Sequence, residues 1–231
     1  MIDLVYCAGK NKRFDDIALA AGYRLGARLP ATVYHPLWFA DQDWRQPNRT
    51  AYMAALAQHR PTMASVLDWE RTEQLPEVLD WAEQAAQFVE VVLIVPKVMG
   101  EISKLPRQVN GKQVRLGYSV PTRYGGTELP LWEFARWPVH LLGGSPHAQM
   151  HVWRHLQGVA EVLSADGNMT QLMATRYCQF WTNGEAKYAN NRYWPRLWEA
   201  EGERMGRDAP YEAFRRSCIN VMAAWRRLCQ D

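Results

Sequence analysis

The stretch Glu161-Val-Leu-Ser-Ala-Asp-Gly-Asn-Met169 decides the fold that the sequence predicts. Residues 161–164 are typical of a buried strand, Asp166 follows in a turn that ends at Asn168, and a helix is predicted from about Met169. Proteins of the α/β class carry reactive groups at the carboxyl ends of their strands, so Asp166 is a candidate catalytic residue. The alternative is that Asp166 only forms an Asx turn or caps the following helix.

Alternating strands and helices extend from this stretch in both directions. Strands are predicted at residues 3–7, 31–37, 62–67, 89–95, 114–120, 139–142 and 161–164, with a weaker eighth at 177–181. Helices are predicted at about 15–26, 49–59, 75–87, 131–136, 147–156, 170–174 and 210–228. This order favours a single α/β domain, a compact TIM-like (β/α) barrel over residues 1–200, with a C-terminal helix in 201–231 packed on it. A doubly wound open sheet is the alternative.

The composition is that of a globular protein, because 48% of the 231 residues are hydrophobic and 22% are charged. No apolar run reaches the roughly 20 residues of a membrane span, and the N-terminus lacks the segments of a secretory signal. The four cysteines form neither a CxxC pair nor a disulfide framework. We therefore expect a cytoplasmic protein without a membrane partner.

The net charge of +3 is unevenly distributed along the chain. One basic cluster consists of Lys10, Lys12 and Arg13. A second, from residue 97 to residue 115, contains Lys97, Lys104, Arg107, Lys112 and Arg115 against one Glu101. Such clusters suit a polyanion, and we expect both to lie beside the active site and bind nucleic acid. The alternative is that they are ordinary solvated loops.

The strand ends of a barrel converge on one mouth, so the polar residues there form a candidate site. Asp68 and Asp166 each end an apolar strand, and glycines would let a planar ligand approach the backbone. The expected substrate-binding residues are Asp68, Glu70, Ser119, Gly143, Gly144 and Asn168. The alternative is that these residues merely finish strands.

Other chemistries find little support in the sequence. There is no GxGxxG or GxxxxGK[ST] loop, so we expect no nucleotide cofactor. The histidines show no HxH or HExxH spacing, so we expect no metal. Ser-His-Asp catalysis lacks its GxSxG elbow, and Cys7 lies in an apolar run typical of a core residue, although a nucleophilic role is open to it.

Three short motifs resemble the tRNA-guanine transglycosylases and their DNA-acting relatives, the DpdA-type enzymes of 7-deazaguanine DNA modification. They are Val114-Arg-Leu-Gly-Tyr-Ser-Val120, His140-Leu-Leu-Gly-Gly-Ser-Pro146 and Val66-Leu-Asp-Trp-Glu70. The resemblance implies that Asp166 is the nucleophile and that Asp68 recognises the base. Asp41 is the nearest match to the family's general acid/base. The family's zinc-binding cysteines are absent, and its nucleophile belongs to the last barrel strand, whereas Asp166 ends the seventh of eight predicted strands.

The resemblance implies cleavage of an N-glycosidic bond, in which a carboxylate attacks C1′ while the base leaves. Because the zinc pattern is absent, we expect DNA as the substrate, with excision of a modified base as a phage-defence enzyme would perform it. Exchange of the base for a 7-deazaguanine in DNA or tRNA is the close alternative. A nucleic-acid-binding module without catalysis and a hydrolase of free nucleosides are others. The oligomeric state stays open.

Overall fold

The computed structural model describes residues 2–7, 11–122, 125–184, 193–198 and 206–230, and in it nine strands form one sheet. The strands are β1 (Asp3–Cys7), β2 (Arg24–Arg28), β3 (Phe39–Asp41), β4 (Met63–Ser65), β5 (Val91–Ile94), β6 (Gln108–Val109), β7 (Lys112–Ser119), β8 (Pro138–Leu142) and β9 (Glu161–Gly167). The helices are α1 (Lys12–Ala20), α2 (Arg49–His59), α3 (Leu75–Ala85), α4 (Pro146–Leu156), α5 (Met169–Tyr177) and α7 (Ala209–Leu228). Short 3-10 helices lie at Thr72–Gln74, Ile102–Lys104 and Leu131–Phe134.

Eight of these strands close into a parallel barrel. The order β5-β4-β3-β2-β1-β9-β8-β7 is parallel throughout, and β5 also pairs with β7, which joins the two ends of the sheet. Strand β6 stands apart, because it forms an antiparallel hairpin with the start of β7. The predicted TIM-like (β/α) barrel is therefore confirmed, and a doubly wound open sheet is wrong.

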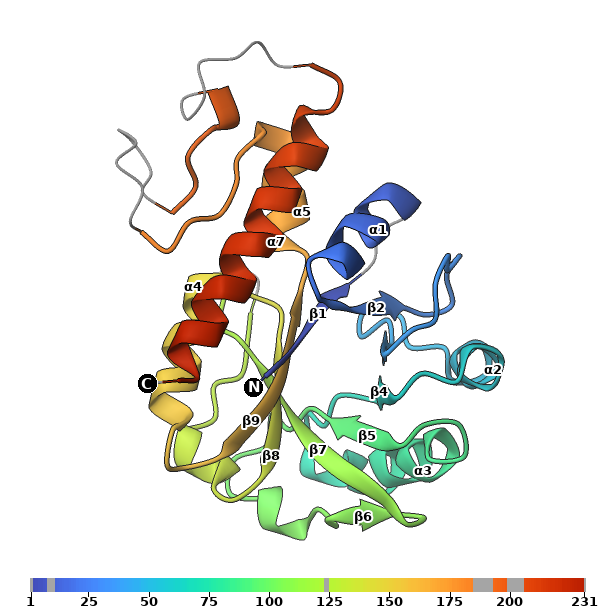
Figure 1. The fold of residues 1–231 in the computed structure, drawn as a ribbon. Coiled ribbons are helices and arrows are strands. Elements are labelled where there is room, and N and C mark those ends of the chain that lie inside the picture. Colours follow the sequence, from blue (N-terminus) through green and yellow to red (C-terminus); the bar gives the residue numbers. More distant parts are fainter. Residues whose placement is uncertain (1, 8–10, 123–124, 185–192, 199–205, 231) are drawn as a thin grey trace.

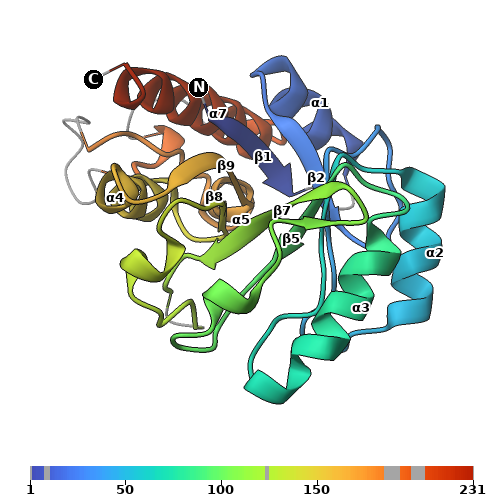
Figure 2. The same ribbon diagram turned by 90° about the horizontal axis from the view of Figure 1, so that it is seen from below.

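Helices surround the strands, as Figure 2 shows for α1, α2, α3, α4 and α7. Helix α7 packs along α5 and α1, so it covers the outside of the barrel where β9 meets β1 (Figure 1). Its inward face buries Phe214, Val221 and Trp225. The helix begins just after Asp208 and has proline at its first turn, a position where the missing N–H removes no helical bond. No helix in the described part of the chain is both long and apolar enough to cross a membrane.

The barrel interior has an apolar part and a polar part. Val5, Phe39, Met63 and Leu93 form a buried apolar cluster contributed by β1, β3, β4 and β5. Arg115, His140, Ser164 and Asp166, from β7, β8 and β9, are buried polar side chains. Buried polar groups are stable only when they are hydrogen-bonded, and the bonds among these four organise the candidate site.

Two of the expected strands and the end of one expected helix differ from the structure. Residues 24–28 form β2, although the sequence predicts a helix up to residue 26. The three central residues of this strand are buried, but the exposed Arg24 and Arg28 at its ends make the apolar run too short to indicate a strand. Residues 31–37 form no strand, and the following residues 39–41 form β3 instead. Residues 177–181 lie outside the barrel, and residue 179 makes only an isolated bridge to Arg196.

These corrections change the position of Asp166 in the barrel. Strand β9 is longer than predicted and runs through Gly167, so Asp166 lies within the strand and not in a turn. Because β2 is added and 177–181 is removed, β9 is the last of the eight barrel strands.

Candidate active site at the carboxyl end of the barrel

A cavity of about 320 Å³, open to solvent, lies at the carboxyl ends of the barrel strands. It brings together six residues that the sequence predicts as catalytic or substrate-binding, together with Lys97 and the exposed Trp44. The cavity is lined by Asp41, Trp44, Asp68, Val95, Lys97, Ser119, Val120, Thr122, Gly125, Gly126, Leu142, Gly143, Gly144 and Asp166. This volume lies at the lower end of the range of small-molecule sites.

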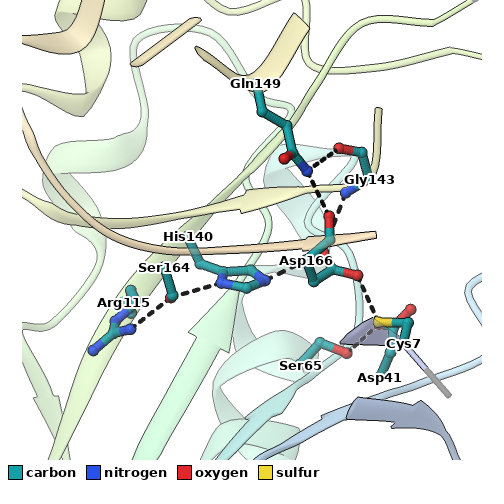
Figure 3. Close-up of polar contacts among 9 residues, drawn as sticks. All are labelled: Cys7, Asp41, Ser65, Arg115, His140, Gly143, Gln149, Ser164 and Asp166. Atoms are coloured by element: carbon teal, nitrogen blue, oxygen red, sulfur yellow. Dashed lines mark hydrogen bonds and ion pairs between the residues drawn. The ribbon is translucent and has the colours of Figure 1, made fainter. Parts of the chain in front are cut away.

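Asp166 accepts hydrogen bonds from three different strands or loops (Figure 3). Oδ1 lies 3.1 Å from the Gly143 amide nitrogen and 3.3 Å from His140 Nε2, and Oδ2 lies 2.7 Å from the Cys7 sulfur. Helix α5 starts instead after Asn168, which occupies the N-cap position. The alternative that Asp166 only caps this helix is therefore wrong.

The backbone around Asp166 is fixed by Gln149 of α4. Its side-chain nitrogen donates to the Gly143 carbonyl at 2.7 Å and to the Asp166 carbonyl at 2.6 Å (Figure 3). Gly143 has φ +64 and Gly144 has φ +79, a conformation that glycine adopts without strain. A Cβ at Gly144 would also lie 2.7 Å from a Val120 methyl group. The two glycines thus allow the turn that aims the Gly143 amide at Asp166.

A Ser-His-Asp chain is present, but its serine cannot be the nucleophile. Ser164 Oγ lies 2.7 Å from His140 Nδ1, while His140 Nε2 faces Asp166. Ser164 and His140 are both fully buried. Arg115 lies at the far end of this chain of side chains from Asp166 and donates to Ser164 Oγ at 2.8 Å. Burial lowers the pKa of His140, which favours a neutral ring. Asp166 is therefore the end of the chain that meets the cavity.

Cys7 is a hydrogen-bond donor at this site. Burial, with the negative charge of Asp166 as the next cause, raises the pKa of the Cys7 thiol well above its usual value. A thiol must ionise to act as a strong nucleophile, so the environment of Cys7 disfavours that role.

Asp41 keeps its proton to higher pH than an ordinary carboxyl. Burial is the largest cause that raises the pKa of Asp41 to about 7, and the charges of Asp166 and Asp68 add to it. Ser65 Oγ donates to Asp41 Oδ1 at 2.7 Å and itself accepts from the Gln42 amide at 3.0 Å. Asp41 is thus oriented and can hold a proton near neutral pH, as a general acid must.

Asp68 and Lys97 form an ion pair at the cavity wall. Lys97 Nζ lies 2.8 Å from Asp68 Oδ2 and 3.0 Å from Glu70 Oε1. Burial raises the pKa of Asp68, and the hydrogen bond from Lys97 opposes that shift. The pair presents a hydrogen-bond acceptor beside a donor, both facing the same space.

Other predicted site residues lie elsewhere. Glu70 is exposed and reaches the site only through Lys97, and Asn168 is exposed outside the cavity lining. Lys10 lies outside the described residues.

The basic clusters are largely neutralised by neighbouring acids. Ion pairs join Lys12 to Asp16, Arg13 to Asp208, Lys104 to Glu101 and Lys112 to Glu90. Arg107 stacks on Trp137 with its guanidinium 3.6 Å from the ring centre. Lys112 begins β7, at the opposite end of the barrel from the cavity, and Arg107 bonds to Arg136 just before β8. The expectation that the whole second cluster borders the site is therefore wrong.

Sequence reasoning missed Trp44 and His140 as parts of the site, and it considered Cys7 only as a nucleophile or a core residue. Trp44 is 51% exposed and lines the cavity, and the Arg45 guanidinium lies 4.8 Å from the centre of its ring. Trp44 follows Asp41, the last residue of β3, by three positions. That spacing was the available signal. His140 and Cys7 gave none, because each lies inside an apolar strand.

Among the described residues, no group of three or more His, Cys, Asp or Glu side chains could hold a metal ion. Asp41, Asp68 and Asp166 line one cavity, but their nearest partners are Ser65, Lys97 and the donors to Asp166.

Comparison with known proteins bears on the family of the chain. No curated protein and no solved structure matches it. A family model, described as "Family of unknown function (DUF6610)", matches residues 18–226, which extend from α1 to α7. Because this match covers most of the barrel, the chain belongs to that family of unknown function.

Proposed function

We propose that this protein is an enzyme that cleaves the N-glycosidic bond of a base in nucleic acid, with Asp166 as the nucleophile. One observation carries the proposal. A single cavity holds Asp166, which accepts three hydrogen bonds, and Asp41, which retains a proton to about pH 7. Two carboxyl groups with different environments are the usual equipment for glycosidic bond cleavage.

The proposed reaction uses the two carboxyl groups in opposite roles. An oxygen of Asp166 forms a bond to C1′ as the bond from C1′ to the base nitrogen breaks. Asp41 gives its proton to the departing base, whose nitrogen would otherwise carry the electron pair of the broken bond. Water then attacks C1′ and releases Asp166, and Asp41 takes a proton from that water.

Other residues of the cavity lining suit recognition of a base. Asp68 accepts and Lys97 donates, a pattern that complements the adjacent donor and acceptor on the hydrogen-bonding edge of a nucleobase. Trp44 offers an aromatic face at the rim on which an extruded base can stack. The pair Gly143 and Gly144 leaves the backbone open to a planar ligand.

The resemblance to transglycosylases supports the same roles. That family carries its nucleophile on the last barrel strand, and Asp166 belongs to the last barrel strand here. Asp41 and Asp68 line the same cavity as Asp166. We favour DNA and excision of a modified base, with exchange as the alternative outcome, because the cysteines of the family's zinc site are absent from this sequence.

Hydrolysis of free nucleosides is a second candidate, and a specific observation favours it. The described basic clusters are mostly ion-paired, and the cavity wall carries three carboxyl groups against Lys97, a balance that repels phosphates. A free nucleoside has no phosphate to be repelled.

The proposal is tested by incubating the protein with modified and unmodified DNA, with tRNA and with free nucleosides, followed by mass spectrometry of released bases. We expect base release from one substrate class, and a fall of about 10⁴-fold or more in Asp166→Asn. The Asp68→Asn variant is the comparison, because it should change which base is accepted. Unchanged release by Asp166→Asn would remove this residue from the mechanism, and binding of DNA without any release would favour a non-catalytic module.

A further inference from the structure

A chain of polar side chains crosses the barrel interior behind Asp166 (Figure 3). Arg115 Nη1 lies 2.8 Å from Ser164 Oγ, which lies 2.7 Å from His140 Nδ1, and His140 Nε2 lies 3.3 Å from Asp166 Oδ1. Arg115 is 7% exposed, and Ser164 and His140 are 0% exposed. None of these three side chains lines the cavity, so any effect on the reaction passes through Asp166.

Counting protons gives the direction of the first hydrogen bond in this chain of side chains. A guanidinium has only donors, so Arg115 donates and one lone pair of the Ser164 hydroxyl is used. The hydroxyl has one proton of its own, and His140 Nδ1 is its close neighbour in the interior. The hydroxyl keeps a second lone pair, so it can donate to Nδ1 or accept from it, and the partner of Nε2 decides between the two tautomers.

The opposite tautomer is disfavoured at the other end of the ring. If Nδ1 carried the proton, the lone pair of Nε2 would face the carboxylate of Asp166, and two electron pairs would oppose each other. If both nitrogens were protonated, the cation would be buried beside Arg115. Arg115 and Asp166 are the charged side chains that act on His140, and burial outweighs the attraction of Asp166 and lowers the pKa of the ring.

We propose that His140 is a positioning residue, held by Arg115 and Ser164 as the neutral Nε2–H tautomer so that it fixes Asp166 Oδ1 and leaves Oδ2 as the attacking atom. Oδ1 receives both N–H donors, from His140 and from Gly143. Among the described residues, Oδ2 receives only the thiol of Cys7, a weak donor. The role of Oδ2 rests on the proposed function, whereas the tautomer does not.

The packing around the ring supports a fixed orientation. The His140 ring lies 5.0 Å from the Phe39 ring, measured between centres, across the barrel interior. The ring therefore lies between an apolar wall and two hydrogen-bonding partners, and both of its nitrogens have a neighbour at a set distance. A turn of the ring by half a revolution would break both hydrogen bonds.

Nitrogen NMR of the intact protein tests the tautomer without any substrate. In ¹⁵N-histidine-labelled protein, we expect His140 to show a protonated Nε2 and a bare Nδ1, with the signals identified by their loss in His140→Gln. His155 is an internal reference, because its Nδ1 lies 2.8 Å from the His151 carbonyl and must donate there. In Ser164→Ala the fraction of the Nε2–H form should fall. A protonated Nδ1 in the unaltered protein overturns the proposal.

Kinetics on the substrate that the base-release experiment identifies test the positioning role. His140→Phe keeps a ring but removes the donor, so we expect kcat to fall by about 100-fold with little change in KM. His140→Gln restores a side-chain N–H and should recover most of the loss. His155→Gln, on the exposed face of α4, is the matched control and should leave kcat unchanged. Full kcat in His140→Phe, or no recovery in a folded His140→Gln, contradicts the proposal.

The two measurements separate the two hypotheses. If the unaltered protein releases no base, the proposed function is wrong, but the tautomer measured by NMR is unaffected. Base release with the Nδ1–H tautomer sinks the positioning role and leaves the function intact.

Discussion

Asp41 and Asp166 lie in one cavity but meet different partners. Asp166 accepts two N–H groups and a thiol, whereas Asp41 accepts the hydroxyl of Ser65 and is destabilised in its charged form by burial. The difference favours a protonated carboxyl group at Asp41 and a carboxylate with a reactive lone pair at Asp166. It also makes the pH dependence of the protein predictable.

We expect kcat/KM for base release to fall as pH rises through about 7, because Asp41 must be protonated to act as the acid and its pKa is raised to about 7. Asp41→Asn should lose this descending limb and run at least about 100-fold slower. A pH profile of both proteins between pH 5 and 9 checks this. An unchanged limb in the variant would assign the titration to another group.

The same group makes stability depend on pH. Folded Asp41 holds its proton to about pH 7, while in the unfolded chain it is lost near pH 4. The stabilising contribution is therefore complete below pH 4 and is lost as pH rises to about 7. The free energy of unfolding, measured with urea, should fall over this range relative to that of Asp41→Asn. Parallel curves for the two proteins would contradict a raised pKa.

The sequence predicted the residues that border the cavity better than those behind it. Asp68, Gly143 and Asp166 follow or end apolar runs, and such positions converge in any parallel barrel. His140 and Ser164 lie inside strands that are buried on both faces, so no alternation of polar and apolar residues shows which side chains point inward. Their roles depend on Arg115, 49 positions before Ser164, which only the closed barrel brings near.

At the scale of one element, β7 depends on a glycine inside the barrel. A Cβ on Gly117 would lie 2.8 Å from methyl groups of Leu142 and Val95. We expect Gly117→Ala to lower the free energy of unfolding by about 1–3 kcal/mol, because a packed interior cannot absorb an added methyl group without strain.

Thermal or urea unfolding of Gly117→Ala measures this loss, and Gly206→Ala is its control. Gly206 is exposed and has no heavy atom within 4 Å of an added Cβ, so that change should stay within about 0.5 kcal/mol. Equal changes in the free energy of unfolding for the two substitutions would show that the interior around Gly117 can accommodate an added methyl group.

Elements differ in how far their own sequence specifies them. Helix α2 was predicted at its observed bounds, Arg49–His59, where Asn48 supplies the N-cap. The sequence does not predict strand β2, because its apolar run is short and is interrupted by Gly26. The barrel requires glycine at this position, since a Cβ there would lie 3.0 Å from Val5 and 3.1 Å from Phe39. The β-branched residues Thr32 and Val33 favour the strand predicted at 31–37. The prediction fails because Pro30 and Pro36 flank them and lack the N–H that a sheet requires.

The whole molecule depends on α7. Phe214 of this helix contacts the rings of Tyr6 and Phe14, 5.0 Å and 5.1 Å away between ring centres, and Trp225 contacts Trp153 at 6.1 Å. A chain that ends at Arg207 would expose all three partners. We expect it to bind a hydrophobic dye and to lose cooperative unfolding.

Size-exclusion chromatography and calorimetry check this prediction against Ile219→Ala. Ile219 is 45% exposed on α7, so its truncation should leave the melting transition nearly unchanged. A shortened chain that stays monomeric and melts cooperatively would show that the barrel is stable without the helix.

The pairing of β1 with β9 places a condition on biosynthesis. Cys7 and Asp166 are 159 positions apart, yet they share a hydrogen bond across that pair of strands. While the chain is being made, β1 emerges before β9 and has an unpaired edge towards this missing neighbour, a surface that can pair with another growing chain. Until β9 has been synthesised, one edge of β1 therefore lacks the strand of its own chain that covers it in the folded barrel.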